Sequence, residues 1–303
     1  MSLRDMLLGL CVVTAWGFNF VVIKVGLYDM PPFLLAGLRF MLVAFPAVFF
    51  IKPPKAPIRW IVAYGMTICF GQFALLFLSI YLGMPAGLAS LVLQAQAFFT
   101  IILAALLMGD KLKWNHIAGT LLAAAGMFFL AEASMTGPAS GGVNGLTMFL
   151  TLAAAFSWAL GNLANKKVMR DKSVSVMSLV VWSALVPIGP FFLMSWIFEG
   201  QDVIAHSLQS LNLTTVSAIF YLAFIASILG YGLWGGLLSR CEIGQVAPLT
   251  LLVPVVGLFS AALFLGESLT TYQLIGAAIV IAGLGVNVFG GRLHREKVAK
   301  SVN

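Results

Sequence analysis

The sequence predicts an all-α, polytopic membrane protein with ten transmembrane helices arranged as two inverted five-helix repeats. Three observations lead to this fold class: the composition, the placement of the charged residues, and an internal repeat. The chain of 303 residues is 61% hydrophobic and only 9% charged, with a mean hydropathy of +1.04. Soluble globular domains average about 25% charged residues, so the composition excludes that class.

Ten apolar segments follow one another along the chain. Each is about 20 residues long, which is enough for a helix to cross roughly 30 Å of hydrocarbon. No gap between them exceeds about 16 residues, which leaves no room for a soluble domain. The expected spans are 6–27, 32–51, 60–83, 86–108, 115–131, 145–165, 174–198, 214–238, 243–265 and 271–290.

Lys and Arg residues occupy alternate gaps, and this alternation predicts the orientation. Fifteen of the 17 fall there: Arg4, Lys52, Lys55, Arg59, Lys111, Lys113, Lys166, Lys167, Arg170, Lys172, Arg240, Arg292, Arg295, Lys297 and Lys300. The intervening gaps hold Asp29, Glu132, Glu199, Asp202 and Glu267, and neither Lys nor Arg. Because cytoplasmic loops collect Lys and Arg, both termini are expected in the cytoplasm. A miscounted span would break the alternation.

The two halves of the chain match each other in sequence. An offset of 142 pairs Lys24 with Lys166. An offset of 157 pairs Gly87 with Gly244, Gly109-Asp110 with Gly266-Glu267, Leu112 with Leu269, Gly119 with Gly276, and Gly126 with Gly283. We therefore expect a first five-helix repeat in 1–132, a second in 145–290, and a cytoplasmic tail in 291–303. The small residues on the fifth and tenth spans predict close helix packing, within the chain or in a dimer.

Five spans per repeat is an odd number, so the second repeat enters the membrane from the opposite side. Lys24 is accordingly expected near the outer face and Lys166 near the inner face. Inverted repeats are typical of secondary transporters, whose substrate site lies near the midplane between the repeats. Two similar halves can rock against each other and expose one site alternately to either side.

Four stretches give the chain a family resemblance: Trp16–Lys24, Ala36–Phe40, Gly83–Thr100 and Val246–Gly257. With them, essentially the whole chain resembles the EamA-type family of the drug/metabolite transporter superfamily. The third stretch is most similar to the bacterial exporter of O-acetylserine and cysteine. The resemblance implies a multi-pass protein of the bacterial inner membrane that exports small amino-acid metabolites, such as O-acetylserine and cysteine, by alternating access. Exporters of aromatic or other neutral amino acids and of drug-like metabolites belong to the same superfamily, and these alternatives stay open.

Two charged residues fall well inside the expected spans. Lys24 lies about 4–5 Å along its helix from the outer end, and Arg39 lies about 10 Å from it. Charged groups inside a membrane are costly and are functional candidates by default, and either could attract the carboxylate of an amino acid. The structural alternatives are snorkelling of Lys24 to the surface, and pairing of either side chain with Asp29 or with loop carbonyls.

Neutral polar and aromatic side chains form the second group of candidates. Amides offer donors and acceptors to α-amino and α-carboxylate groups, and aromatic rings can face an ammonium group. The alternative for each amide is a hydrogen bond between helices. Together with Lys24 and Arg39, the substrate-binding or gating candidates are Trp16, Asn19, Gln72, Gln94, Gln96, Trp158, Asn162, Tyr231 and Trp234. Ser79 shares a helical stripe with Gln72, and Ser90 shares one with Gln94.

Other classes find little support in the sequence. No GxxxxGK[ST], HExxH or GxSxG motif is present, so neither an ATP site nor an enzyme is expected. The three cysteines lack CxxC spacing, and no metal or other cofactor is expected. The basic residues are split among short gaps, which suits a lipid bilayer rather than nucleic acid. A membrane scaffold without transport activity stays a remote alternative, and monomer and homodimer are both open.

The absence of acidic residues from the expected spans bears on how transport would be driven. None of the expected spans contains Asp or Glu, the residues that proton-coupled carriers often use as relays. This favours facilitated export of a small molecule down its gradient, and leaves proton coupling open.

Overall fold

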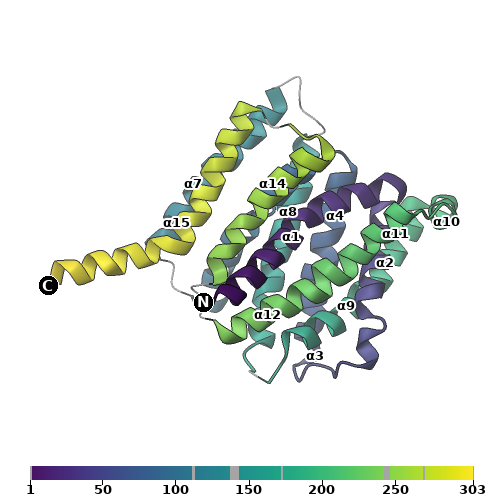
Figure 1. Ribbon diagram of the computed structural model, residues 1–303, viewed down its shortest axis with the longest axis horizontal. Coiled ribbons are helices and arrows are strands. Elements are labelled where there is room, and N and C mark those ends of the chain that lie inside the picture. Colours follow the sequence, from purple (N-terminus) through teal and green to yellow (C-terminus); the bar gives the residue numbers. More distant parts are fainter. Residues whose placement is uncertain are drawn as a thin grey trace.

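The computed structural model describes residues 2–110, 113–136, 143–171, 173–241, 246–268 and 270–302, and every regular element in these ranges is a helix (Figure 1). The elements of the first half are α1 Leu3–Asp29, α2 Pro32–Ala44, η1 Ala47–Phe49, α3 Ile58–Tyr64, η2 Gly65–Gly71, α4 Gln72–Tyr81, α5 Ala86–Val92, α6 Ala95–Met108 and α7 Trp114–Thr136. Those of the second half are α8 Gly145–Val168, α9 Val176–Met194, η3 Ser195–Glu199, α10 Gln201–Gln209, α11 Leu213–Phe220, η4 Tyr221–Leu229, α12 Gly230–Arg240, η5 Ala247–Leu251, α14 Leu252–Leu265 and α15 Thr271–Val302.

Seven helical segments among the described residues are long and apolar enough to cross a membrane, and Leu249–Leu265 and Leu274–Gly290 are shorter apolar helices. The seven are Leu3–Asp29, Pro32–Phe49, Ile58–Tyr81, Ala86–Met108, Gly145–Val168, Val176–Glu199 and Leu213–Arg240. The prediction of an all-helical, polytopic membrane protein is confirmed. Each of the ten expected spans overlaps helical structure, and ten membrane crossings stay a prediction.

The structure departs from an unbroken helix in one expected span and adds helical structure outside the spans in two places. The span at 86–108 is broken at Leu93–Gln94, where i→i+3 hydrogen bonds such as Gln94 N–Leu91 O (3.1 Å) tighten the chain between α5 and α6. The gap between the seventh and eighth expected spans contains helix α10, whose nine residues are too few to cross a membrane. The tail continues α15 as far as Val302.

The irregularities of the helices recur at the offset of 157 that relates the two halves. A π-helical stretch interrupts the third span at Gly65–Gly71 and the eighth at Tyr221–Leu229. The fourth span breaks between α5 and α6, and the ninth changes at Leu251 from η5 to α14. Gly109 and Gly266 end α6 and α14 with φ of 71° and 66°, a left-handed conformation that favours glycine. The repeat is therefore present in the backbone as well as in the sequence. Three residues of the sequence repeat, Gly244, Leu112 and Leu269, lie outside the described residues.

The packing of the helices is reciprocal between the halves. Helix α1 packs against α14, and its counterpart α8 packs against α6; α2 packs against α9, and α7 against α15. Figure 1 shows α7 and α15 side by side at one edge of the bundle. This pairing is what a pseudo-two-fold axis between two inverted repeats produces.

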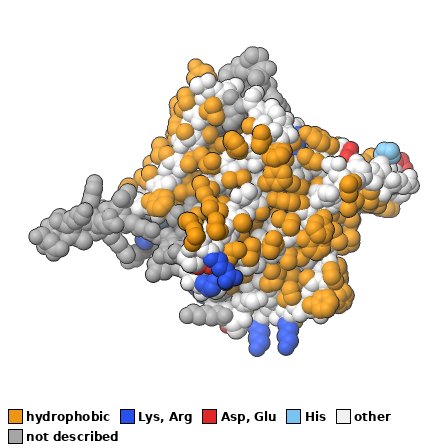
Figure 2. Space-filling view, in the orientation of Figure 1, with side chains coloured by type: hydrophobic (Ala, Val, Ile, Leu, Met, Phe, Trp, Pro, Cys, Tyr) orange, Lys and Arg blue, Asp and Glu red, His pale blue; other side chains and the backbone are white. Residues whose placement is uncertain are grey.

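The two ends of the bundle differ in charge. We call the end with Lys52, Lys166 and Arg240 the basic end, and the end with Asp29, Glu199 and Glu267 the acidic end. In Figure 2, Lys and Arg side chains project from the lower edge, and a broad hydrophobic surface lies above them. Such a surface suits the hydrocarbon of a bilayer.

Glycines bring α7 and α15 into close contact, as the sequence predicts. A Cβ at Gly119 would lie 2.7 Å from the carbonyl oxygen of Gly283, and one at Gly126 would lie 2.8 Å from that of Gly276. The contacts are reciprocal in the two repeats. Small residues let the backbones approach within the chain, so these faces are used for internal packing rather than left for a dimer.

Gly283→Ala should destabilise this contact, because the new Cβ would lie 2.7 Å from Gly119 O and 2.8 Å from Ala123 N. Overpacking of this kind costs about 1–3 kcal/mol. We expect the midpoint of thermal unfolding in detergent to fall by several degrees. Gly285→Ala is the matched control, since nothing lies within 4 Å of a Cβ there. Equal midpoints for the two variants would contradict the packing described.

Candidate functional site

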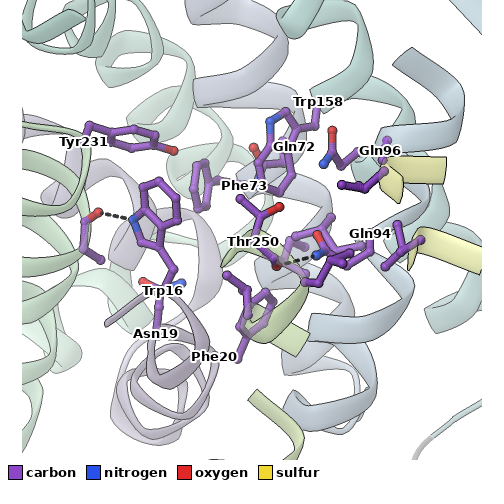
Figure 3. A pocket seen from close by; sticks show the side chains of 18 of the residues that line it. Trp16, Asn19, Phe20, Gln72, Phe73, Gln94, Gln96, Trp158, Tyr231 and Thr250 are labelled. Carbon is purple, nitrogen blue, oxygen red and sulfur yellow. Dashed lines mark hydrogen bonds between the residues drawn. The ribbon is translucent and has the colours of Figure 1, made fainter. Parts of the chain in front are cut away.

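A cavity of about 260 Å³ lies inside the bundle, between the two repeats. Residues from α1, α2, α4, α6, α8, η4, α12, η5, α14 and α15 line it, together with Leu93 and Gln94 from the break between α5 and α6. Figure 3 shows these side chains converging on the cavity from several helices. Eight of the eleven candidate residues line it: Trp16, Asn19, Arg39, Gln72, Gln94, Gln96, Trp158 and Tyr231.

The other three candidates lie outside this cavity. Lys24 donates from Nζ to the carbonyl oxygen of Ile80 at 3.2 Å, near the end of α4. Trp234 packs against Trp16, with ring centroids 5.3 Å apart. Asn162 lines a second cavity on the side of the basic end. The structure thus assigns Lys24 and Trp234 supporting contacts rather than positions on the cavity wall.

Trp16 is held as a fixed part of the wall. Its indole N–H donates to the carbonyl oxygen of Ala226 at 2.9 Å, as drawn in Figure 3. The rings of Tyr231 and Trp234 both lie 5.3 Å from it, tilted by 52° and 54°. Because the hydrogen bond joins α1 to the π-helical stretch η4, the two repeats meet at this aromatic cluster.

Arg39 is the charged group of the cavity. Its side chain is only 3% exposed. Nη2 donates to the hydroxyl of Ser227 at 3.0 Å, and the guanidinium carbon lies 4.1 Å from the ring centre of Phe73. In the part of the chain that the structure describes, Nε and Nη1 have no hydrogen-bond partner.

An unpaired buried cation is costly, so the partner of Arg39 matters. The expected pairing with Asp29 is not formed, because that carboxylate accepts hydrogen bonds from Asn212 (2.8 Å) and Thr215 (3.3 Å) at the acidic end. Contact with the ring of Phe73 supplies part of the stabilisation, but it gives neither Nε nor Nη1 a hydrogen-bond acceptor. Buried donors without partners disfavour the cavity without a ligand. A ligand with anionic oxygens would supply the missing acceptors.

The amides divide into bonded and unbonded groups. Gln94 donates from Nε2 to the carbonyl oxygen of Thr250 at 3.4 Å (Figure 3). Asn19 is 8% exposed, and its Oδ1 lacks a hydrogen-bond partner among the described residues. Arg39 and Asn19 therefore bring an unpaired donor and an unpaired acceptor to one cavity.

A second cavity of about 470 Å³ lies between the first and the basic end. Asp110, Lys113, His116 and Lys166 line it, and Lys166 Nζ lies 2.6 Å from a carboxylate oxygen of Asp110. We call it the vestibule. Ile101 lines both cavities.

A small polar cluster stands between the two cavities. Nδ2 of Asn162, on the vestibule side, donates to Oε1 of Gln96 at 2.8 Å and to the hydroxyl of Thr100 at 3.0 Å. Gln96 lines the central cavity, and Thr100 lines the vestibule. These bonds therefore connect the wall of the central cavity to the wall of the vestibule.

Two residues that share stripes with the candidates serve the packing instead. Ser90 donates to the carbonyl oxygen of Gly87 at 2.6 Å, and Ser79 donates to that of Thr147 at 2.7 Å. The break at Leu93–Gln94 interrupts the helix between Ser90 and Gln94, and of these two only Gln94 lines the central cavity.

Three neighbours of the candidates were not among the predicted site residues. Phe73 carries the ring contact to Arg39, Ser227 accepts its hydrogen bond, and Thr250 holds Gln94. Ser227 stood on the helical face of Tyr231 in the sequence, which was a usable signal. Phe73 is one of 24 phenylalanines in the chain, and nothing in its local sequence sets it apart.

These features define a polytopic membrane protein with an interior cavity and a vestibule between that cavity and one end of the bundle. The model of the EamA-like transporter family matches residues 3–131 and 145–289. The chain belongs to the EamA-like transporter family, and it is therefore classed with transporters and not with enzymes.

Similar proteins agree with this membership. A "Probable amino-acid metabolite efflux pump" of Salmonella typhimurium is 58% identical over 298 residues, covering 97% of this chain and 98% of that protein. One of the same description from Escherichia coli is 57% identical over 296 residues, with 97% and 98% covered. A solved crystal structure superimposes with a TM-score of 0.65 at 19% identity, covering 96% of this chain and 99% of the other. That likeness concerns the fold alone.

Substitutions at Asn162 should change passage from the vestibule into the central cavity. As a reporter, Ala97→Cys places a thiol on the cavity wall, in a background with Cys11, Cys69 and Cys241 replaced by Ala. Asn162→Ser removes both bonds and side-chain volume, and should speed alkylation of the reporter from the basic end. Asn162→Phe adds an apolar ring and should slow it severalfold. Equal alkylation rates in the two variants would show that this cluster does not control passage.

Proposed function

We propose that the protein exports small amino-acid metabolites, with O-acetylserine and cysteine among its substrates, across the bacterial inner membrane by alternating access. Family membership and the two efflux pumps at 57–58% identity support amino-acid metabolite export. The specific substrates rest on the resemblance of the stretch at 83–100. The central cavity is the proposed substrate site.

One observation carries the proposal: Arg39 lines the cavity with two N–H-bearing nitrogens unpaired. A guanidinium presents a planar fork of donors that matches a carboxylate, and such charge-assisted pairs are among the stronger hydrogen bonds. Away from water, the pair would also neutralise the buried charge. An α-carboxylate is the part that all amino-acid metabolites of this class share.

The α-ammonium group of such a substrate also finds suitable chemistry. Asn19 Oδ1 is an unpaired acceptor on the same cavity. The rings of Trp16 and Tyr231 line the cavity as well, and aromatic faces attract ammonium groups. These groups favour a zwitterion over a simple carboxylic acid or a simple amine.

Orientation and energetics are inferred from charge. The basic end is proposed to face the cytoplasm, with both termini there, because Lys and Arg gather in cytoplasmic loops. The vestibule with Lys113 and Lys166 then receives substrate from the cell interior. None of the described residues that line the central cavity is Asp or Glu, which supports facilitated export down a concentration gradient.

Aromatic amino acids are the second candidate substrates. Trp16, Phe20, Phe73, Trp158 and Tyr231 line the cavity, and ring–ring contacts would stabilise an aromatic side chain there. Phenylalanine and tryptophan therefore belong in every substrate panel beside the small metabolites.

Counterflow in proteoliposomes tests the proposal. Vesicles are loaded with unlabelled O-acetylserine or cysteine, and entry of labelled cysteine is followed under reducing conditions without an ion gradient. We expect accelerated entry. Failure of every amino acid in the panel, with and without a pH gradient and with folded protein in the vesicles, would refute amino-acid export.

Arg39→Met should weaken substrate binding and leave the fold intact. Hydrogen bonds to charged groups contribute about 1.5–3 kcal/mol, so the half-saturating concentration should rise by about 10- to 100-fold. Arg39→Lys keeps the charge without the fork and should fall between. Arg170→Met, a change of an exposed basic residue outside both cavities, is the control. An unchanged half-saturating concentration in Arg39→Met would exclude carboxylate binding by this residue.

A further inference from the structure

Glu267 ties the two repeats together at the acidic end. Its Oε1 accepts the backbone N–H of Ala86 at 2.7 Å, and its Oε2 accepts that of Gly87 at 2.9 Å. The carboxylate comes from the connection between α14 and α15 in the second repeat, whereas the two amides begin α5 in the first. We call this pair of hydrogen bonds the outer latch.

The local sequence is suited to this contact. The first N–H groups of a helix have no partner within the helix, and a carboxylate there gains from both hydrogen bonds and the helix dipole. Gly87 leaves space for it, because a Cβ at this position would lie 3.3 Å from Glu267 Oε2 and 3.2 Å from Ala261 Cβ. Ala261 itself is fully buried, so the latch closes over a packed region.

The repeat places the same residue types at the basic end with different partners. The counterpart of Glu267 is Asp110, and that of Lys24 is Lys166. Asp110 and Lys166 form an ion pair at 2.6 Å beside the open vestibule. At the acidic end the corresponding pair is not formed: Glu267 caps α5, and Lys24 donates to the carbonyl oxygen of Ile80.

We propose that Glu267 is the gating residue of the acidic end, and that it exchanges partners during the transport cycle. With this end closed, its carboxylate holds the amides of Ala86 and Gly87. When the end opens, the carboxylate leaves α5 and pairs with Lys24, as Asp110 pairs with Lys166 at the end that has the vestibule. The inference deepens the proposed function and rests on it, because only a carrier needs the closed end to open.

The symmetry of the repeat also identifies where opening would be seen. Ala104 lines the vestibule at the basic end, and its counterpart at the offset of 157 is Ala261. An Ala261→Cys reporter, in a background without the three native cysteines, should therefore react with a membrane-impermeant maleimide from the acidic side only while this end is open. The reaction needs no transported substrate, so its result is independent of substrate identity.

Three variants separate the two partners of Glu267. Glu267→Gln loses the charge in both states, but charge-assisted bonds to backbone amides outweigh a partly exposed ion pair; alkylation of the reporter should rise about tenfold. Glu267→Asp keeps the charge on a shorter side chain and should give a smaller rise. Lys24→Met removes the partner proposed for the open state and, in the closed state, only the bond to the carbonyl oxygen of Ile80 within the first repeat. It should lower alkylation by about two- to fivefold.

A reporter remote from the latch controls for general loosening of the fold. Ala184→Cys lies in α9 and is 1% exposed; its alkylation should stay unchanged in all three variants. Equal rises at both reporters, no change with Glu267→Gln, or faster alkylation with Lys24→Met would each overturn the latch. If the variants leave reporter alkylation unchanged while amino-acid counterflow is intact, the latch alone is refuted. If the variants change alkylation as predicted but no amino acid is transported, the proposed substrates alone are refuted.

Discussion

In hydrocarbon, no water is available to bind backbone N–H and C=O groups, so the protein must satisfy each of them internally. This constraint governs the places where the helices of this chain begin, widen or break. Glu199 accepts the N–H groups of Phe33 (2.6 Å) and Leu34 (3.2 Å) at the start of α2, as Glu267 does for α5. The hydroxyl of Tyr221 donates to the carbonyl oxygen of Ala15 at 2.9 Å.

Each of these bonds joins the first repeat to the second. Exposed backbone groups at helix irregularities thus become the contacts that hold the halves together. Trp16 acts in the same way through the carbonyl oxygen of Ala226. A carrier that rocks its halves must exchange such contacts rather than lose them, which is why a carboxylate with two alternative partners is suited to a gate.

Two of the residues with unsatisfied polar atoms lie at the proposed substrate cavity. Arg39 and Asn19 are buried and have unpaired atoms, and both line the central cavity. Asn115 also has an unpaired Oδ1, but its Nδ2 donates to the carbonyl oxygen of Asn287 at 2.7 Å between α7 and α15. Arg39 and Asn19 differ from Asn115 in lying at one cavity, and this position supports the proposal of a ligand with both a carboxylate and an ammonium group.

The features that could be predicted from the sequence are those that depend on residue type and on the length of apolar segments. Apolar length predicts the helical segments, and glycines such as Gly109 and Gly266 recur because the same left-handed turns recur. Eight of the eleven candidates line the cavity, because amides and a charge in an apolar helix have few other reasons to be there. Partners were not predictable: Asp29 is bound by Asn212 instead of Lys24 or Arg39, and this depends on distances across the bundle. The break at Leu93–Gln94 could not be predicted, because neither Gly nor Pro stands at that point of the sequence.

The central claim is that the unpaired donors of Arg39 bind the substrate carboxylate. The most direct test is an experimental structure of the protein, determined by electron cryomicroscopy in a lipid nanodisc saturated with O-acetylserine or cysteine. The account predicts the carboxylate within hydrogen-bond distance of Nε or Nη1 of Arg39, with the ammonium group facing Asn19. A substrate bound elsewhere, with both nitrogens of Arg39 satisfied by protein carbonyl groups, would contradict it.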